Sequence, residues 1–180
     1  MTAAIIRPVR PEDRLEVYRV LYEAWNTSYA PILGKEAALR LQPGPNRIAF
    51  AIMMSTRTQE LQFDVAEVDN RVVGFVLSGP GGYFNRHFVW MLYVDPAYQR
   101  QGVGRRLLNS ALERAGRARA IRLHVLKNNL AAQEFYESHG FQVVCECTHV
   151  WTWQRIKVLQ RSLLAEATPP VVGLRGYLFG

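Results

Sequence analysis

Hydrophobic and polar positions alternate along this chain with two different periods, which divide it into predicted helices and strands. Apolar residues recur every three or four positions from Leu15 to Trp25, so we expect a helix there. From about Leu61 the period changes to two. Residues 61–68 and 72–77 therefore predict two strands of a hairpin joined by the turn Asp69-Asn70.

The second half of the chain predicts strands and helices in succession. After a strand over residues 84–94 and a glycine loop, the pattern predicts a helix with Val103, Leu107, Leu108, Ala111, Leu112 and Ala115 on one face. A strand over 121–125 and a helix that runs to His139 and is ended by Gly140 follow. Two further strands are expected at about 141–153 and 156–163. With a short strand at 4–9 and helical material near 35–54, this order predicts an α/β domain with a mixed sheet.

Length and composition limit the class of protein. A chain of 180 residues with 49% hydrophobic content suits one compact domain, which we place at residues 1–164, followed by an extension over 165–180 to which we assign no role. No apolar run is long enough to span a bilayer, and the first residues lack the basic-then-apolar order of a signal peptide. We therefore expect a soluble cytoplasmic protein without a membrane partner.

The two cysteines, Cys145 and Cys147, stand two positions apart on a predicted strand. That spacing is a poor arrangement for a mutual disulfide. Without further Cys or His at ligand spacing, a zinc or other metal site is not expected either. The pattern favours two small hydrophobic residues in a reducing compartment.

The charge balance points to an anionic ligand. The chain has 22 Lys and Arg against 15 Asp and Glu, a formal charge of +7. Nucleic acid and a polyanionic cofactor are both compatible with that surplus. The arginines favour the cofactor and disfavour nucleic acid, because they gather in one stretch of the sequence: Arg100, Arg105, Arg106, Arg114, Arg117, Arg119 and Arg122.

That stretch contains a glycine loop between a predicted strand and a predicted helix. Gly102 and Gly104 let the backbone approach a ligand closely, and the first N–H groups of the helix point toward incoming phosphates. A Walker loop is excluded because Gly-Lys-Ser/Thr is absent. The dinucleotide fingerprint fails because Leu107 stands where its third glycine is required.

Two blocks of this sequence resemble the motifs of the GNAT superfamily of N-acetyltransferases. The first runs from Met91 to Leu108 and contains Gln99-Arg100-Gln101-Gly102-Val103-Gly104; the second runs from Leu123 to Phe141. The resemblance covers nearly the whole chain except its tail. It implies a mixed, mostly antiparallel sheet that is splayed at the cofactor cleft and flanked by helices.

The resemblance also implies an activity: transfer of an acetyl group from acetyl-CoA to an amine acceptor by direct attack in a ternary complex. The amine can belong to a small molecule or a protein. A non-catalytic CoA-binding regulatory module and a ribosome- or RNA-associated protein acetyltransferase are the alternatives. Dimers are common among related folds, so a homodimer stays open.

The family pattern assigns cofactor contacts residue by residue. The backbone at Leu92, Tyr93 and Val94 is expected to hydrogen-bond pantetheine, and an N–H there to stabilise an oxyanion. Asn129 matches a cofactor-contacting position, and it can also cap the following helix. The expected wrap around the pyrophosphate consists of Gln99, Arg100, Gln101, Gly102, Val103, Gly104 and Arg105.

Two residues are expected to carry the chemistry. Tyr136 matches the family tyrosine near the cofactor sulfur, where a phenol with a pKa near ~10 can donate a proton to the departing thiolate. His124 stands where some relatives place a Glu, and imidazole changes its charge near neutral pH, as a general base requires. His87 is a second candidate base. Tyr29 and Tyr83 are candidates for the acceptor pocket.

Overall fold

The computed structural model describes residues 3–58, 60–81, 86–116, 120–151 and 154–163. These residues form a seven-stranded sheet in the order β1-β2-β3-β4-β5-β7-β6. The strands are β1 (Ile5–Pro8), β2 (Gln62–Val68), β3 (Arg71–Pro80), β4 (Arg86–Val94), β5 (Ala120–Leu126), β6 (Gln142–Trp151) and β7 (Gln154–Leu163). The helices are α1 (Arg14–Ser28), α2 (Ala30–Leu33), α3 (Lys35–Leu41), α4 (Pro45–Arg57), α5 (Val103–Ala115) and α6 (Leu130–Glu137).

The predicted order of elements is confirmed, with shifts at several boundaries. Among the described strands β4 and β5 form the parallel pair, and the other neighbours are antiparallel, so the sheet is mixed and mostly antiparallel. Helix α1 runs three residues beyond its predicted end at Trp25, because the backbone N–H of Tyr29 still bonds to the Trp25 carbonyl. The predicted extension at 165–180 lies outside the described residues.

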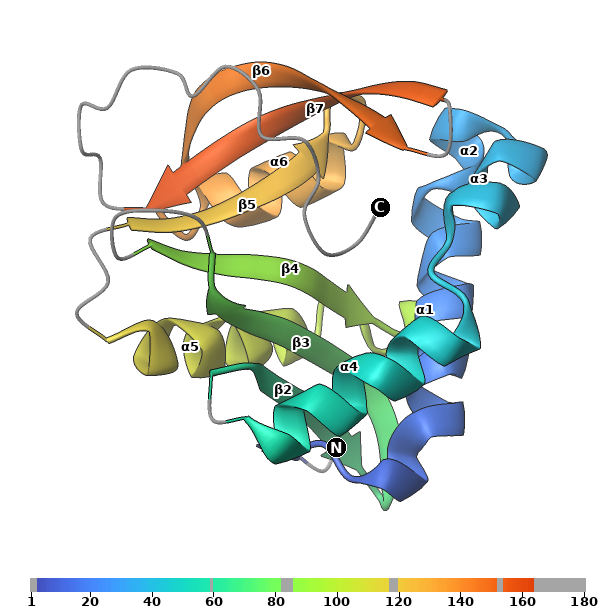
Figure 1. Ribbon diagram of the computed structural model, residues 1–180, viewed down its shortest axis with the longest axis vertical. Coiled ribbons are helices and arrows are strands. Elements are labelled where there is room, and N and C mark those ends of the chain that lie inside the picture. Colours follow the sequence, from blue (N-terminus) through green and yellow to red (C-terminus); the bar gives the residue numbers. More distant parts are fainter. Residues whose placement is uncertain (1–2, 59, 82–85, 117–119, 152–153, 164–180) are drawn as a thin grey trace.

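Helices cover both faces of the sheet (Figure 1). On one face, α1 and α4 pack over β2 to β4 around a core that includes Trp25, Phe75 and Leu77. On the other face, α5 and α6 close a second core around Leu107, Leu123 and Phe141. In the part of the chain that the structure describes, no helix is long and apolar enough to cross a membrane.

Strands β4 and β5 diverge soon after they meet (Figure 1). They pair only over Arg86–Phe88 and Ala120–Arg122, although both strands continue for several residues. A bulge contributes to the divergence: Leu77 faces Met91 and Ser78 faces Val89, which leaves Trp90 as the extra residue of β4. Because a bulge bends its strand and increases the local twist, it turns β4 away from β5. The splay predicted from the family resemblance is present.

Candidate active site

The glycine loop follows β4 and opens directly into α5. Arg100 and Gly102 both have positive φ, 61° and 82°. Gly102 caps the helix, and the first backbone hydrogen bond inside α5 runs from the Arg106 N–H to the Gly102 carbonyl at 3.1 Å. The N–H groups of residues 103–105 precede that bond, so they form the donor end of the helix. This end attracts anions through both its free donors and the helix dipole.

Side chains around the loop separate into inward and outward groups. Val103 is buried in the α5 core, so only its backbone can serve a ligand. Arg100 and Arg105 are exposed, which leaves two guanidinium groups near the donor end of α5. Gln101 is also exposed, but its side-chain amide donates to the Ala97 carbonyl at 2.9 Å and thereby closes the loop on itself.

A partly buried ion pair fixes the start of this loop. The Asp95 carboxylate accepts a hydrogen bond from the Ala97 N–H at 3.0 Å and pairs with the Arg19 guanidinium at 2.5 Å. Arg19 lies on α1 and also donates to the Val72 carbonyl at 2.8 Å. No local sequence pattern indicates this anchor, because its two partners stand 76 positions apart in the chain.

Leu92, Tyr93 and Val94, whose backbone was predicted to bind pantetheine, do not all direct their backbone groups the same way, because of the register of β3 and β4. The Asp95 N–H donates to the Val73 carbonyl, and antiparallel pairing alternates bonded and non-bonded residues. The backbone groups of Tyr93 therefore bond to β3, whereas those of Leu92 and Val94 point away from β3, toward the divergence from β5. Gln99 already uses one of these groups, since its amide donates to the Val94 carbonyl at 3.2 Å.

Helix α6 brings Tyr136 to the other side of the divergence. The side-chain oxygen of Asn129 caps this helix by accepting from the Ala132 N–H at 3.2 Å, as predicted; the cofactor role of Asn129 stays a prediction. Tyr136 is 9% exposed, and its ring packs edge-on against Phe135 and Phe141, with centroids 5.1 and 5.6 Å away. These contacts hold the phenol in one position.

A buried arginine ties α6 to the sheet. Arg161 on β7 is 1% exposed, and its guanidinium donates to Glu137 at 2.7 Å, to Gln133 at 3.1 Å and to the Phe141 carbonyl at 3.4 Å. Three positions that flank Tyr136 are thus held by one side chain. No local sequence pattern indicates this support, because the partners of Arg161 stand 20 to 28 positions away in the chain.

Three aromatic residues from α1, its C-terminal cap and β4 lie together in the core on the α1 face of the sheet. Tyr29 stacks on Trp25 with ring centroids 4.4 Å apart, and it lies 6.2 Å from Tyr93. Burial raises the pKa of Tyr136, and the charge of Tyr29 adds to that shift. Tyr29 thus influences the ionisation of Tyr136, and its role in the acceptor pocket stays a prediction.

His124 is exposed on β5, and it points to the face that carries α1. Its neighbours on the strand, Leu123 and Val125, belong to the core under α5 and α6, and successive side chains of a strand alternate in direction. The imidazole lies 5.3 Å from the Phe88 ring. His124 is therefore accessible from the face on which Tyr29 and Tyr93 lie.

The second candidate base is placed differently. His87 lies where β4 and β5 are still paired, opposite Ile121, and is 8% exposed. Burial lowers the pKa of its imidazole, and Nε2 has no hydrogen-bond partner among the described residues. His87 is therefore a buried neutral residue at the closed end of the strand pair. Tyr83, the other predicted acceptor residue, lies outside the described residues.

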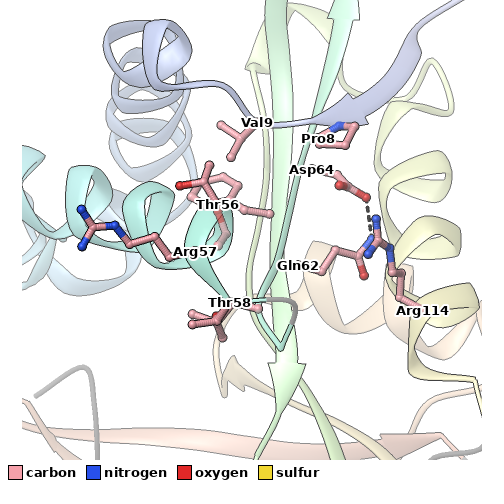
Figure 2. Close-up of a pocket in the computed structure, with 11 residues that line it drawn as sticks. Pro8, Val9, Thr56, Arg57, Thr58, Gln62, Asp64 and Arg114 are labelled. Atoms are coloured by element: carbon pink, nitrogen blue, oxygen red, sulfur yellow. Dashed lines mark hydrogen bonds between the residues drawn. The ribbon is translucent and has the colours of Figure 1, made fainter.

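A separate pocket of about 390 Å³ lies at the β1–β2 edge of the sheet. Figure 2 shows Gln62, Asp64 and Arg114 on one side of it and Thr56 on the other. Gln62 and Asp64 bond to each other and to Ser110, so these polar groups satisfy one another. None of the predicted site residues lines this pocket, and we assign it no part in the chemistry.

Comparisons with known proteins agree with this arrangement. The chain is 31% identical over 85 residues to the uncharacterized N-acetyltransferase YafP of Escherichia coli, spanning 44% of this chain and 53% of that protein. It is 28% identical over 139 residues to a probable N-acetyltransferase of Mycobacterium tuberculosis, spanning 77% of this chain and 79% of that one.

Solved structures share the fold. The PaiA N-acetyltransferase of Thermoplasma acidophilum in complex with coenzyme A superposes with a TM-score of 0.76 at 22% identity, covering 88% of this chain and 98% of that one. YncA of Salmonella typhimurium with acetyl-CoA, a putative acetyltransferase, gives 0.69 at 20% identity, covering 96% and 100%. The sequence model of the acetyltransferase (GNAT) family matches residues 18–141. The chain belongs to this family of acetyltransferases.

Proposed function

We propose that this chain transfers an acetyl group from acetyl-CoA to an amine by direct attack in a ternary complex. The position of Tyr136 carries the proposal. Tyr136 shares one buried cluster with Val94 at the end of β4, with Val103 at the start of α5 and with core residues of β5. Its phenol would therefore serve a ligand that enters where β4 and β5 diverge. The coenzyme A and acetyl-CoA complexes of similarly folded proteins support the choice of donor.

The residues present suit such a donor. The N–H groups of residues 103–105 and the exposed guanidinium groups of Arg100 and Arg105 would bind the pyrophosphate. The backbone of Leu92 and Val94 would bind pantetheine, and the Leu92 N–H would stabilise the oxygen of the thioester carbonyl. Asn129 stands at the start of α6, on the β5 side of the same divergence.

Two side chains would move protons. His124 would take a proton from the ammonium form of the acceptor, so that the amine lone pair attacks the acetyl carbon. When the tetrahedral intermediate collapses, the carbon–sulfur bond would break and Tyr136 would donate its proton to the thiolate. The extra proton on the product nitrogen would then leave and restore the phenol of Tyr136. Burial raises the pKa of Tyr136, so the phenol is protonated at neutral pH and available as a donor.

Release of free thiol from acetyl-CoA, measured with a panel of amines, tests the activity. Small amines, amino acids and peptides with free N-termini or lysines are compared, because the acceptor is unassigned. We expect thiol release that depends on one class of amine. Binding of CoA without turnover on any of them would favour the regulatory alternative.

A cytoplasmic location and a homodimer also stay predictions.

The role of His124 is tested by its pH dependence. His124→Gln should lower kcat by about 10- to 100-fold, and kcat should no longer fall toward acidic pH. His124→Glu supplies another base, so it should recover much of the rate with activity extended to lower pH. Unchanged rate and profile in His124→Gln would remove the histidine from the mechanism.

A further inference from the structure

The two cysteines of β6 are closer together than their place in the sequence suggests. Their Sγ atoms are 3.1 Å apart, and both side chains are half-buried free thiols. Residues two positions apart on a strand share one face. The register of β6 also shifts between Val143 and Cys145, and such a bulge increases the local twist. The pair is thus a vicinal dithiol that small molecules can reach.

The dithiol lies in register with His124. Cys145 pairs across the strands with Gln160 of β7, and Gln160 pairs with His124 of β5. Residues directly opposite each other in a sheet have side chains on the same face, about 5 Å apart at each step. The Cys145 thiol donates a hydrogen bond to Oε1 of Gln160 at 3.4 Å. One glutamine therefore separates the dithiol from the candidate base.

We propose that Cys145 and Cys147 are a covalent modification site, at which hydrogen peroxide or an organic hydroperoxide converts the dithiol to an intrastrand disulfide. The Cys145 thiolate attacks a peroxide oxygen, the O–O bond breaks, and the leaving oxygen departs as water or alcohol. The Cys147 sulfur then attacks the sulfenic sulfur of Cys145, and its proton leaves with the hydroxyl group as water. The two thiols supply the two electrons that reduce the peroxide.

The environment of each thiol sets the order of these steps. Burial raises the pKa of Cys147 to about 11, and the hydrogen bond and charge of Cys145 add to the shift. Cys147 therefore stays protonated, so we assign the attack on the peroxide to Cys145 and the second step to Cys147. In a regular strand, positions i and i+2 have Cα atoms about 6.6 Å apart, close to the upper limit of about 6.8 Å for a disulfide, which is why the spacing alone disfavours one. Here the Sγ atoms already lie 3.1 Å apart beside a bulge, so a small closure of the two side chains would form the bond.

Mass spectrometry of the peroxide-treated full chain tests the modification independently of acetyl transfer. We expect a loss of about 2 Da, no remaining free thiol, and full reversal by dithiothreitol. Cys147→Ser is the matched control: it should show no such loss, and its Cys145 should accumulate sulfenic acid that dimedone traps. Two thiols that persist, or that oxidise separately to sulfinic acid, would overturn the proposal, as would disulfides only between chains.

A second measurement examines the link to His124, which rests on the proposed function. Disulfide formation removes the thiol proton that bonds to Gln160, so we expect kcat of the oxidised protein to fall by about fivefold and to recover on reduction. Cys147→Ser cannot form the disulfide, so the fivefold fall in kcat should not appear when this variant is treated with peroxide. A disulfide with unchanged kcat would overturn the link to His124 alone. A chain without any acetyl transfer would refute the proposed function while the mass shift still decides the modification.

Discussion

The two sides of the β4–β5 divergence contribute different kinds of chemical group. The β4 side, made of β4, the glycine loop and α5, offers mainly backbone: the groups of Leu92 and Val94 and the N–H groups at the start of the helix. The β5 side, made of β5, β7 and α6, offers side chains, above all His124 and Tyr136.

This difference decides what holds each side in place. Backbone groups are directed by φ and ψ, so the β4 side depends on local features such as Gly102 and the turn after Asp95. Side chains are directed by their neighbours, so the β5 side depends on distant partners such as Arg161. Substitutions should therefore fail in different ways on the two sides.

The largest effect is expected on the β5 side, at the phenol itself. Tyr136→Phe should lower kcat by at least about 100-fold, because the thiolate leaves without a proton donor. The dissociation constant of acetyl-CoA, measured by calorimetry, should change less than about threefold, since the ring still packs against Phe135 and Phe141. Tyr98→Phe on the β4 side is the matched control and should keep kcat; equal rates in both variants would remove Tyr136 as the acid.

Removal of Arg161 should break the support of the β5 side. Arg161→Ala loses three hydrogen bonds and leaves space in a buried site, so the free energy of unfolding should fall by about 2–4 kcal/mol in urea denaturation. Arg161→Met fills the space and should cost less. The exposed Arg105→Ala of the β4 side should change stability by less than about 0.5 kcal/mol. Similar losses in both alanine variants would contradict the comparison.

The two loop glycines sharpen the comparison on the β4 side. Gly102→Ala places a side chain at φ 82°, so it should cost about 1 kcal/mol of stability and weaken acetyl-CoA binding by several-fold. A Cβ at Gly104 would lie 3.5 Å from the Phe135 ring, an ordinary contact, so Gly104→Ala should fold normally. Calorimetry should then show weaker acetyl-CoA binding by Gly104→Ala. Because this variant folds normally, the loss would mean that the bound ligand lies close to the backbone at residue 104.

The smallest effect is expected from His87, a β4 side chain outside the proposed chemistry. Burial lowers its pKa in the folded state, so the unfolded chain binds a proton first as pH falls below about 6.5. Stability from this residue is present above that pH and is lost below it, by at most about 1.4 kcal/mol per pH unit. His87→Leu should flatten the decline in urea midpoint between neutral and acidic pH, and an equally steep decline would contradict the burial argument.

Sequence patterns predicted most of the architecture, for a physical reason. Helix α5 was predicted in the right place, because its apolar stripe and the glycine loop before it are local signals. The end of α1 shifted by three residues and the start of β6 by one, since tertiary contacts extend or shorten the ends of elements. Glu67 pairs with Arg7 at 2.6 Å, a contact across two strands that no local pattern shows.

For the site, the sequence by itself determined the glycine loop, the cap at Asn129 and the position of Tyr136 on its helix, because each follows from short-range geometry. Only the tertiary structure decided that Leu92 and Val94, and not Tyr93, direct their backbone toward the divergence from β5. It alone placed Arg19 on Asp95, Arg161 beneath α6 and Cys145 one glutamine away from His124. These contacts depend on strand register and on packing between distant segments, and neither is written into any short stretch of the chain.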